Sequence, residues 1–173
     1  MRIASKTWLV GGGLALMASL NSWASDGTEE KFLKDAIQGN LAEVDVGKMA
    51  QQKGATQAVK DFGAMLVKDH QMANERAAQV AQQLSIAAPD KPNMKQQAIA
   101  QKLARLSGIK FDQAFAEDMV KDHQEDIAQY QNESQLSGPV GDYAKATLPT
   151  LHEHLKMAEG LQISTHATAA TAK

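Results

Sequence analysis

The chain has 173 residues, of which 43% are hydrophobic, 5% aromatic and 22% charged, and its formal net charge is -2. This length suits one domain with a hydrophobic core, and the scarcity of aromatic residues and proline disfavours a β-sandwich or a β-barrel. The near-neutral charge gives no basic footprint for nucleic acid, and the lack of cysteine excludes disulfides and thiolate metal sites.

Residues 1–24 are predicted to be a cleavable signal peptide. Arg2 and Lys6 supply positive charge, an apolar run follows from Thr7 to Leu20, and small residues around Ala24 suit cleavage there. The run is short and rich in glycine, so an uncleaved membrane anchor is the less favoured alternative. No second apolar stretch follows. We therefore expect a mature chain without a membrane span, in the periplasm or otherwise exported.

Residues 25–163 are predicted to form one all-α domain, divided by glycine and proline. Asp26 and Glu29 have the spacing of a helix cap, and Pro149 should kink or split the last helix because it lacks a backbone donor. Residues 164–173 are expected to be a flexible tail. The predicted helices are 26–52, 56–85, 93–106, 111–135 and 140–163. Four long helices and one short one favour an antiparallel four-helix bundle with the short helix in a crossover.

One internal repeat crosses the predicted helices. The segment 67–71, Val-Lys-Asp-His-Gln, recurs at 120–124 with an offset of 53 residues, and Phe62 and Phe115 are in the same register. The identity predicts two helical hairpins of common descent, packed with approximate two-fold symmetry.

Each long helix places one ionisable residue on its apolar face. At 100° per residue, His70, His123 and His154 lie at the centres of apolar stripes, and Glu43 lies among apolar residues of the first helix. His152 falls on the opposite side from His154 and is expected to be exposed. A buried carboxylate is unfavourable unless another group pairs with it.

These four residues predict a metal site of three imidazoles and one carboxylate, which suits zinc or copper better than iron. Asp126 shares a face with His123 and is a candidate fifth ligand, whereas Asp69 and Asp122 are placed to hold the imidazoles in orientation. The alternative is a metal-free network of glutamate and histidine that fixes helix register. Helical periodicity does not show whether the four residues meet at one depth.

The chain resembles the exported ferritin-like family known as domain of unknown function 4142. The resemblance rests on Gly39-Asn40-x-x-Glu43-Val44, on Gly47-Lys48-x-Ala50, on the two Val-Lys-Asp-His segments and on Leu148-Pro149-x-Leu151-x-x-His154-Leu155. It implies a ferritin-like bundle and an envelope location. It also marks Asn40 among the matching positions, and we expect Asn40 to support the ligands. The Glu-x-x-His motif of ferritin-like di-iron centres is missing, which disfavours iron storage and oxygen chemistry.

The function predicted first is a non-enzymatic metal-binding protein of the periplasm, acting in envelope metal handling or stress tolerance. Two alternatives remain open: a metal-free helical module that binds a protein partner or the envelope, and a ferritin-like redox enzyme that depends on a metal. No nucleophile–base arrangement or phosphate loop is recognisable in the sequence, which disfavours hydrolases and kinases. The sequence leaves the oligomeric state and any protein partner undetermined.

Overall fold

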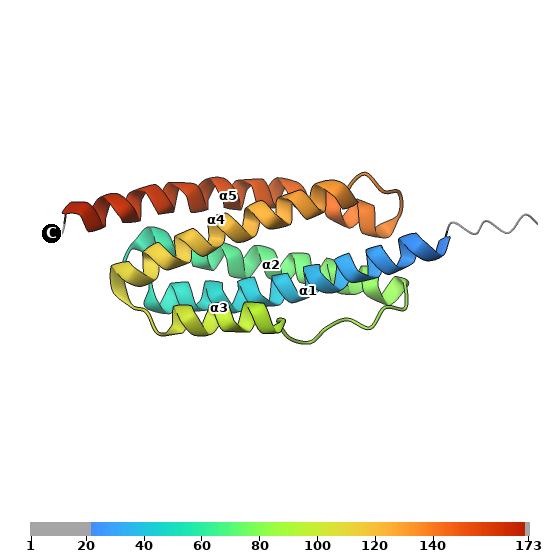
Figure 1. Ribbon diagram of the computed structural model, residues 1–173, viewed down its shortest axis with the longest axis horizontal. Coiled ribbons are helices and arrows are strands. Elements are labelled where there is room, and N and C mark those ends of the chain that lie inside the picture. Colours follow the sequence, from blue (N-terminus) through green and yellow to red (C-terminus); the bar gives the residue numbers. More distant parts are fainter. Residues whose placement is uncertain (1–21, 172–173) are drawn as a thin grey trace, which may run out of the picture.

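The structure, a computed structural model, describes residues 22–171, and these form five helices (Figure 1). Their bounds are α1 Ser22–Lys53, α2 Gln57–Gln83, α3 Met94–Ala104, α4 Gly108–Glu133 and α5 Pro139–Thr171. Of the predicted signal peptide, residues 1–21 lie outside the described residues. Among the helices that are described, none combines the length and the apolar content required to cross a membrane.

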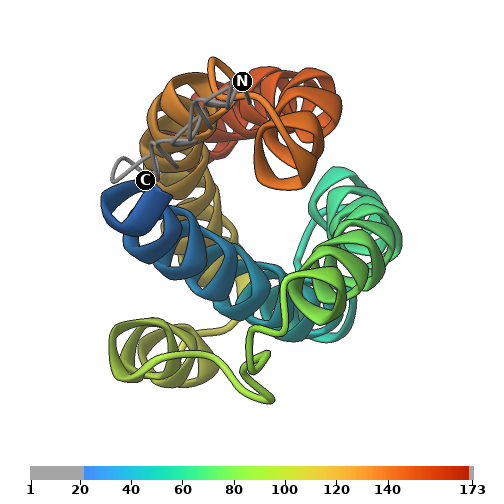
Figure 2. The same cartoon turned by 90° about the vertical axis from the view of Figure 1, so that its right-hand side faces the viewer.

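The four long helices form two antiparallel hairpins that pack into one bundle. α1 packs mainly against α2, and α4 packs mainly against α5. The segment between α2 and α4 returns along the bundle and contains α3, which lies outside the four-helix ring (Figures 1 and 2). α2 and α4 consequently run in the same direction at opposite corners. This is the crossover connection of ferritin-like bundles, so the predicted fold class is confirmed.

The core consists of two apolar clusters separated by a polar layer. One cluster includes Phe32, Ile37 and Tyr143, and the other includes Phe62, Leu66 and Phe115. On each long helix, the residues of the polar layer fall between the residues of the two clusters. The side chains of this layer are each 0–4% exposed, and they belong to Asn40, Glu43, His70, His123 and His154.

Glycine allows α1 and α2 to approach each other closely beside this layer. A Cβ atom on Gly63 would lie 2.6 Å from the Gly47 carbonyl oxygen, and one on Gly47 would lie 2.7 Å from the Gly63 carbonyl oxygen. Backbone atoms cannot move aside as a flexible side chain can, so each position excludes even a methyl group. The crossing therefore fixes which turns of α1 face which turns of α2.

A buried carboxylate holds the turn between α1 and α2. Asp112 of α4 is fully buried and accepts hydrogen bonds from the backbone nitrogens of Ala55 and Thr56, at 2.8 and 2.9 Å, and from the Thr56 hydroxyl at 2.9 Å. Thr56 in turn caps α2 through its side chain. These bonds tie the first hairpin to the second at one end of the bundle, a role that the sequence analysis did not predict for Asp112.

Several helix boundaries differ from those predicted. α1 begins at Ser22, so Asp26 lies four residues inside the helix and not at its start. α5 continues past Ile163 to Thr171, and Thr165 is only 2% exposed, because the last part of this helix packs beside α4. Pro149 does not split α5. Its ring lies on the exposed side, where water can satisfy the carbonyl that loses its donor.

The internal repeat lies on α2 and α4. These are the second helix of one hairpin and the first helix of the other, so the chain order does not fit the predicted duplication of a whole hairpin. The repeated residues nevertheless meet across the bundle. The ring centroids of Phe62 and Phe115 are 5.9 Å apart, and those of His70 and His123 are 5.8 Å apart.

Candidate metal centre

Three histidines from three helices meet inside the bundle. His70 of α2, His123 of α4 and His154 of α5 each offer one ring nitrogen, and these nitrogens all lie within 4.8 Å of one another. The ring centroids are 5.3–5.8 Å apart. Within the described part of the chain, these histidines are the one group of three or more metal-ligating side chains whose ligand atoms lie close together.

Each histidine uses its second nitrogen to donate a hydrogen bond to a fixed acceptor. His70 Nδ1 donates to the Asn40 side-chain oxygen at 2.9 Å, and His123 Nδ1 donates to the Met119 carbonyl at 2.9 Å. His154 Nε2 donates to an Asp69 carboxylate oxygen at 3.0 Å. In the neutral rings, the lone pairs of His70 Nε2, His123 Nε2 and His154 Nδ1 are therefore left facing the shared centre.

These inward nitrogens lack suitable partners in the protein. His70 Nε2 is buried and has no hydrogen-bond partner. His123 Nε2 lies 3.3 Å from His154 Nδ1, a contact between two lone pairs when both rings are neutral. Two nitrogens bound to one tetrahedral zinc ion at the usual bond length lie about 3.3 Å apart. The spacing of this pair already matches shared ligation.

Burial keeps two of the rings, those of His70 and His123, in the neutral form that binds metal. Desolvation and then the neighbouring histidines hold the pKa of His70 well below its ordinary value of 6.5. Desolvation and then His154 lower the pKa of His123 to about 4, against an opposing contribution from its hydrogen bond to Met119. A metal ion arriving at neutral pH would not have to displace protons from these two rings.

The two predicted carboxylate ligands lie elsewhere. Neither Glu43 nor Asp126 belongs to the converging group. Glu43 is 3% exposed but shares a hydrogen bond with Asp122, and burial followed by nearby carboxylates raises its pKa well above the ordinary value. Burial and then Asp122 likewise raise the pKa of Asp126. Both face the side of the bundle near α3, so the predicted meeting of Glu43 with the three imidazoles is not found.

The two aspartates of the repeat have different surroundings. Asp69 accepts a hydrogen bond from His154 across the seam between α2 and α5. Asp122 contacts Glu43 instead of an imidazole. Asn40 accepts the hydrogen bond from His70 through its side-chain oxygen, and the Asn40 amide nitrogen donates to the Tyr143 hydroxyl at 3.1 Å. The Tyr143 hydroxyl lies 3.2 Å from the Tyr130 hydroxyl. Only the positions of the two tyrosines on their helices could have indicated this extension of the network.

Comparison with known proteins agrees with the resemblance seen in the motifs. Residues 16–161 match the family described as Domain of unknown function (DUF4142). No curated protein and no solved structure gives a match. Because the family match spans most of the sequence, including all three histidines, the chain belongs to the DUF4142 family.

Proposed function

We propose that this protein binds one transition-metal ion through His70 Nε2, His123 Nε2 and His154 Nδ1. The supporting observation is that three buried lone pairs converge while each opposite ring nitrogen is held by its own acceptor. Metal-ligating histidines commonly have this arrangement, because the outer hydrogen bond fixes both the tautomer and the ring orientation.

The donor set favours zinc or copper. Three neutral imidazoles without thiolate suit either ion, and three histidines with a fourth, non-protein ligand form a known zinc arrangement. Hard ions such as magnesium and calcium prefer oxygen ligands. When bound, such an ion supplies a Lewis acid at the centre of the bundle, and the protein contributes three oriented ligands within an apolar shell.

A proton is the competing occupant of this centre. A protonated His154 would donate to His123 from one ring nitrogen and form an ion pair with Asp69 from the other. That arrangement leaves His70 Nε2 without a partner, whereas a metal ion satisfies all three nitrogens. We therefore favour the metal-bound form at neutral pH.

We also propose that the protein acts outside the cytoplasm, in metal handling or in tolerance of metal stress in the envelope. The N-terminal charge, apolar run and small residues support export. Mass spectrometry of the protein from a periplasmic fraction tests this proposal, and the expected N-terminus lies close to residue 25. Retention of the complete N-terminal segment would contradict it.

Metal binding is tested with the mature chain purified without a histidine tag, stripped of metal and titrated with zinc or copper(II). We expect one ion per chain and a rise in thermal stability, about 2.7 kcal/mol when free metal is 100 times Kd. His70→Gln, His123→Gln and His154→Gln should each lose the high-affinity ion. His152→Gln is the matched control, because His152 is exposed on the same helix as His154 and should leave binding unchanged.

Spectroscopy separates loss of a ligand from loss of fold. Copper(II) bound at this centre should show electron paramagnetic resonance couplings from imidazole nitrogen, and variants that remain helical by circular dichroism should lose them. Binding that is equal in the wild type and in the three variants would contradict the assignment. A helical wild-type protein that takes up neither ion would leave the histidine layer with a structural role only.

A further inference from the structure

A cavity of about 450 Å³ lies between α1, α3 and α4, apart from the three histidines. Its walls include Val46, Ile99 and Met119, and carboxylates from α1 and α4 line it as well. A cavity of this size, with apolar walls and a few convergent polar groups, is the usual form of a site for a small organic molecule.

The polar groups of this cavity include an unsatisfied buried carboxyl. Glu43 lines the cavity and is 3% exposed, and its Oε2 atom has no hydrogen-bond partner. Asp118 also lines the cavity, and its Oδ2 atom is likewise buried without a partner. A buried acceptor that receives no hydrogen bond destabilises the folded state, because it loses its hydration without a replacement. A positively charged donor placed in the cavity would remove this penalty.

The geometry favours an organic cation over a metal ion. Among the described residues, Glu43, Asp118 and Asp122 do not form a converging group of three ligands. A metal held by two carboxylates would retain several water molecules, and these need polar partners. The apolar walls do not supply them, whereas they suit the hydrocarbon part of an organic ligand.

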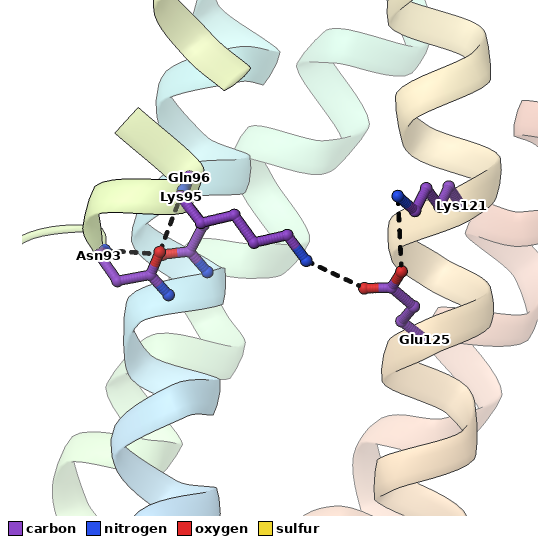
Figure 3. A network of polar contacts seen from close by, with 5 residues as sticks. All are labelled: Asn93, Lys95, Gln96, Lys121 and Glu125. Carbon is purple, nitrogen blue, oxygen red and sulfur yellow. Dashed lines mark hydrogen bonds and ion pairs between the residues drawn. The ribbon is translucent and has the colours of Figure 1, made fainter. Parts of the chain in front are cut away.

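The cavity is lined by three lysines, Lys95, Lys102 and Lys121, and two of them pair with a carboxylate at its rim. Lys95 extends from α3 toward α4 and lies 3.4 Å from Glu125, and Lys121 lies 3.8 Å from the same carboxylate (Figure 3). These side chains are largely exposed. Glu125 thus balances part of the positive charge at the rim, and Lys102 acts on Asp118. Among the described residues, none of the three lysines forms an ion pair with Glu43.

We propose that this cavity binds a small organic ammonium ion. Its charged head pairs with Glu43 and displaces to solvent the proton that Glu43 holds against Asp122, and its apolar body lies against Val46, Ile99 and Met119. The ligand would enter beside α3, the short helix in which Leu103 is the buried residue. This site is separate from the histidine centre, and neither proposal depends on the other.

The test uses the metal-free mature chain with n-hexylammonium as the probe and 1-hexanol as its neutral counterpart. Isothermal titration and amide chemical shifts report binding. We expect hexylammonium to bind at least about tenfold more tightly than the alcohol and to shift the amides of Glu43, Ile99 and Met119, because a charged hydrogen bond is worth more than a neutral one.

Two variants alter the site in independent ways. Glu43→Gln should weaken hexylammonium binding at least about tenfold, since glutamine keeps the shape but cannot release a proton and become the carboxylate that pairs with the ammonium head. Ile99→Trp should block the cavity and abolish binding while Glu43 remains. Glu117→Gln is the control: Glu117 is on the exposed surface of α4, paired with His166, and its substitution should have no effect.

Three results with the probe alone would overturn the proposal. They are absence of binding by the wild type, equal affinity for amine and alcohol, and binding that survives both Glu43→Gln and Ile99→Trp. Displacement of the probe by equimolar magnesium would show an inorganic cation site and would overturn it as well.

Discussion

The buried histidines predict a specific dependence of stability on pH in the metal-free protein. His123 has a pKa of about 4 when folded and an ordinary value of 6.5. Between these two values the unfolded chain binds a proton at this position and the native protein does not. Native stability must therefore rise with pH across the window and be lost as pH falls through it.

The size of this effect follows from the width of the window. One proton difference gives a slope of about 1.4 kcal/mol per pH unit, so His123 contributes about 3 kcal/mol between the two pKa values. Glu43 acts in the opposite direction. Its raised pKa means that the native protein keeps a proton that the unfolded chain releases above about 4.5, so this contribution to stability is lost as pH rises.

Because the two contributions oppose each other, the informative quantity is the difference between variants. The free energy of unfolding is measured by urea denaturation with circular dichroism, in a metal chelator, from about pH 4.5 to 6.5. His123→Gln should reduce the slope against pH by about 1.4 kcal/mol per unit. His152→Gln is the matched control, because the His152 side chain is exposed on α5. Identical slopes for wild type and His123→Gln would refute the reasoning.

Three further substitutions test the packing and the hydrogen bonds. Gly63→Ala should lower the free energy of unfolding by about 1–3 kcal/mol in urea denaturation, because its Cβ would meet a backbone carbonyl of α1 at 2.6 Å. Gly160→Ala is the control and should not destabilise the protein, because the space around Gly160 is open. Asp69→Ala should weaken metal binding about 10- to 100-fold, measured by titration, since it removes the acceptor that orients the His154 imidazole. Asp122→Ala, the counterpart in the repeat, should change the metal affinity much less, because Asp122 contacts Glu43. Equal losses of affinity in the two variants would contradict the assignment. Asp112→Ala should destabilise the protein by at least about 2 kcal/mol in thermal or urea unfolding, because three donors at the α1–α2 turn lose their acceptor. An unchanged stability would contradict this prediction and would show that water replaces the carboxylate.

The sequence by itself determined the helices and the direction in which their key side chains point. A period of 3.6 residues places His70, His123 and His154 on the apolar stripes, and all three are buried. The length of the helices and the glycine and proline between them predicted the four-helix bundle with its crossover. These properties depend on local periodicity and chain breaks, which are visible in one sequence.

Tertiary structure decided which inward-pointing residues meet. Periodicity fixes the angle of a side chain around its helix. Glu43 contacts Asp122 and does not join the histidines, and this choice depends on how α1 packs against α2 and α4. The same reason explains why Asp69 reaches an imidazole and Asp122 does not, although their local sequences are identical. The two identical segments lie on different helices with different neighbours, so side chains with the same local sequence make different contacts.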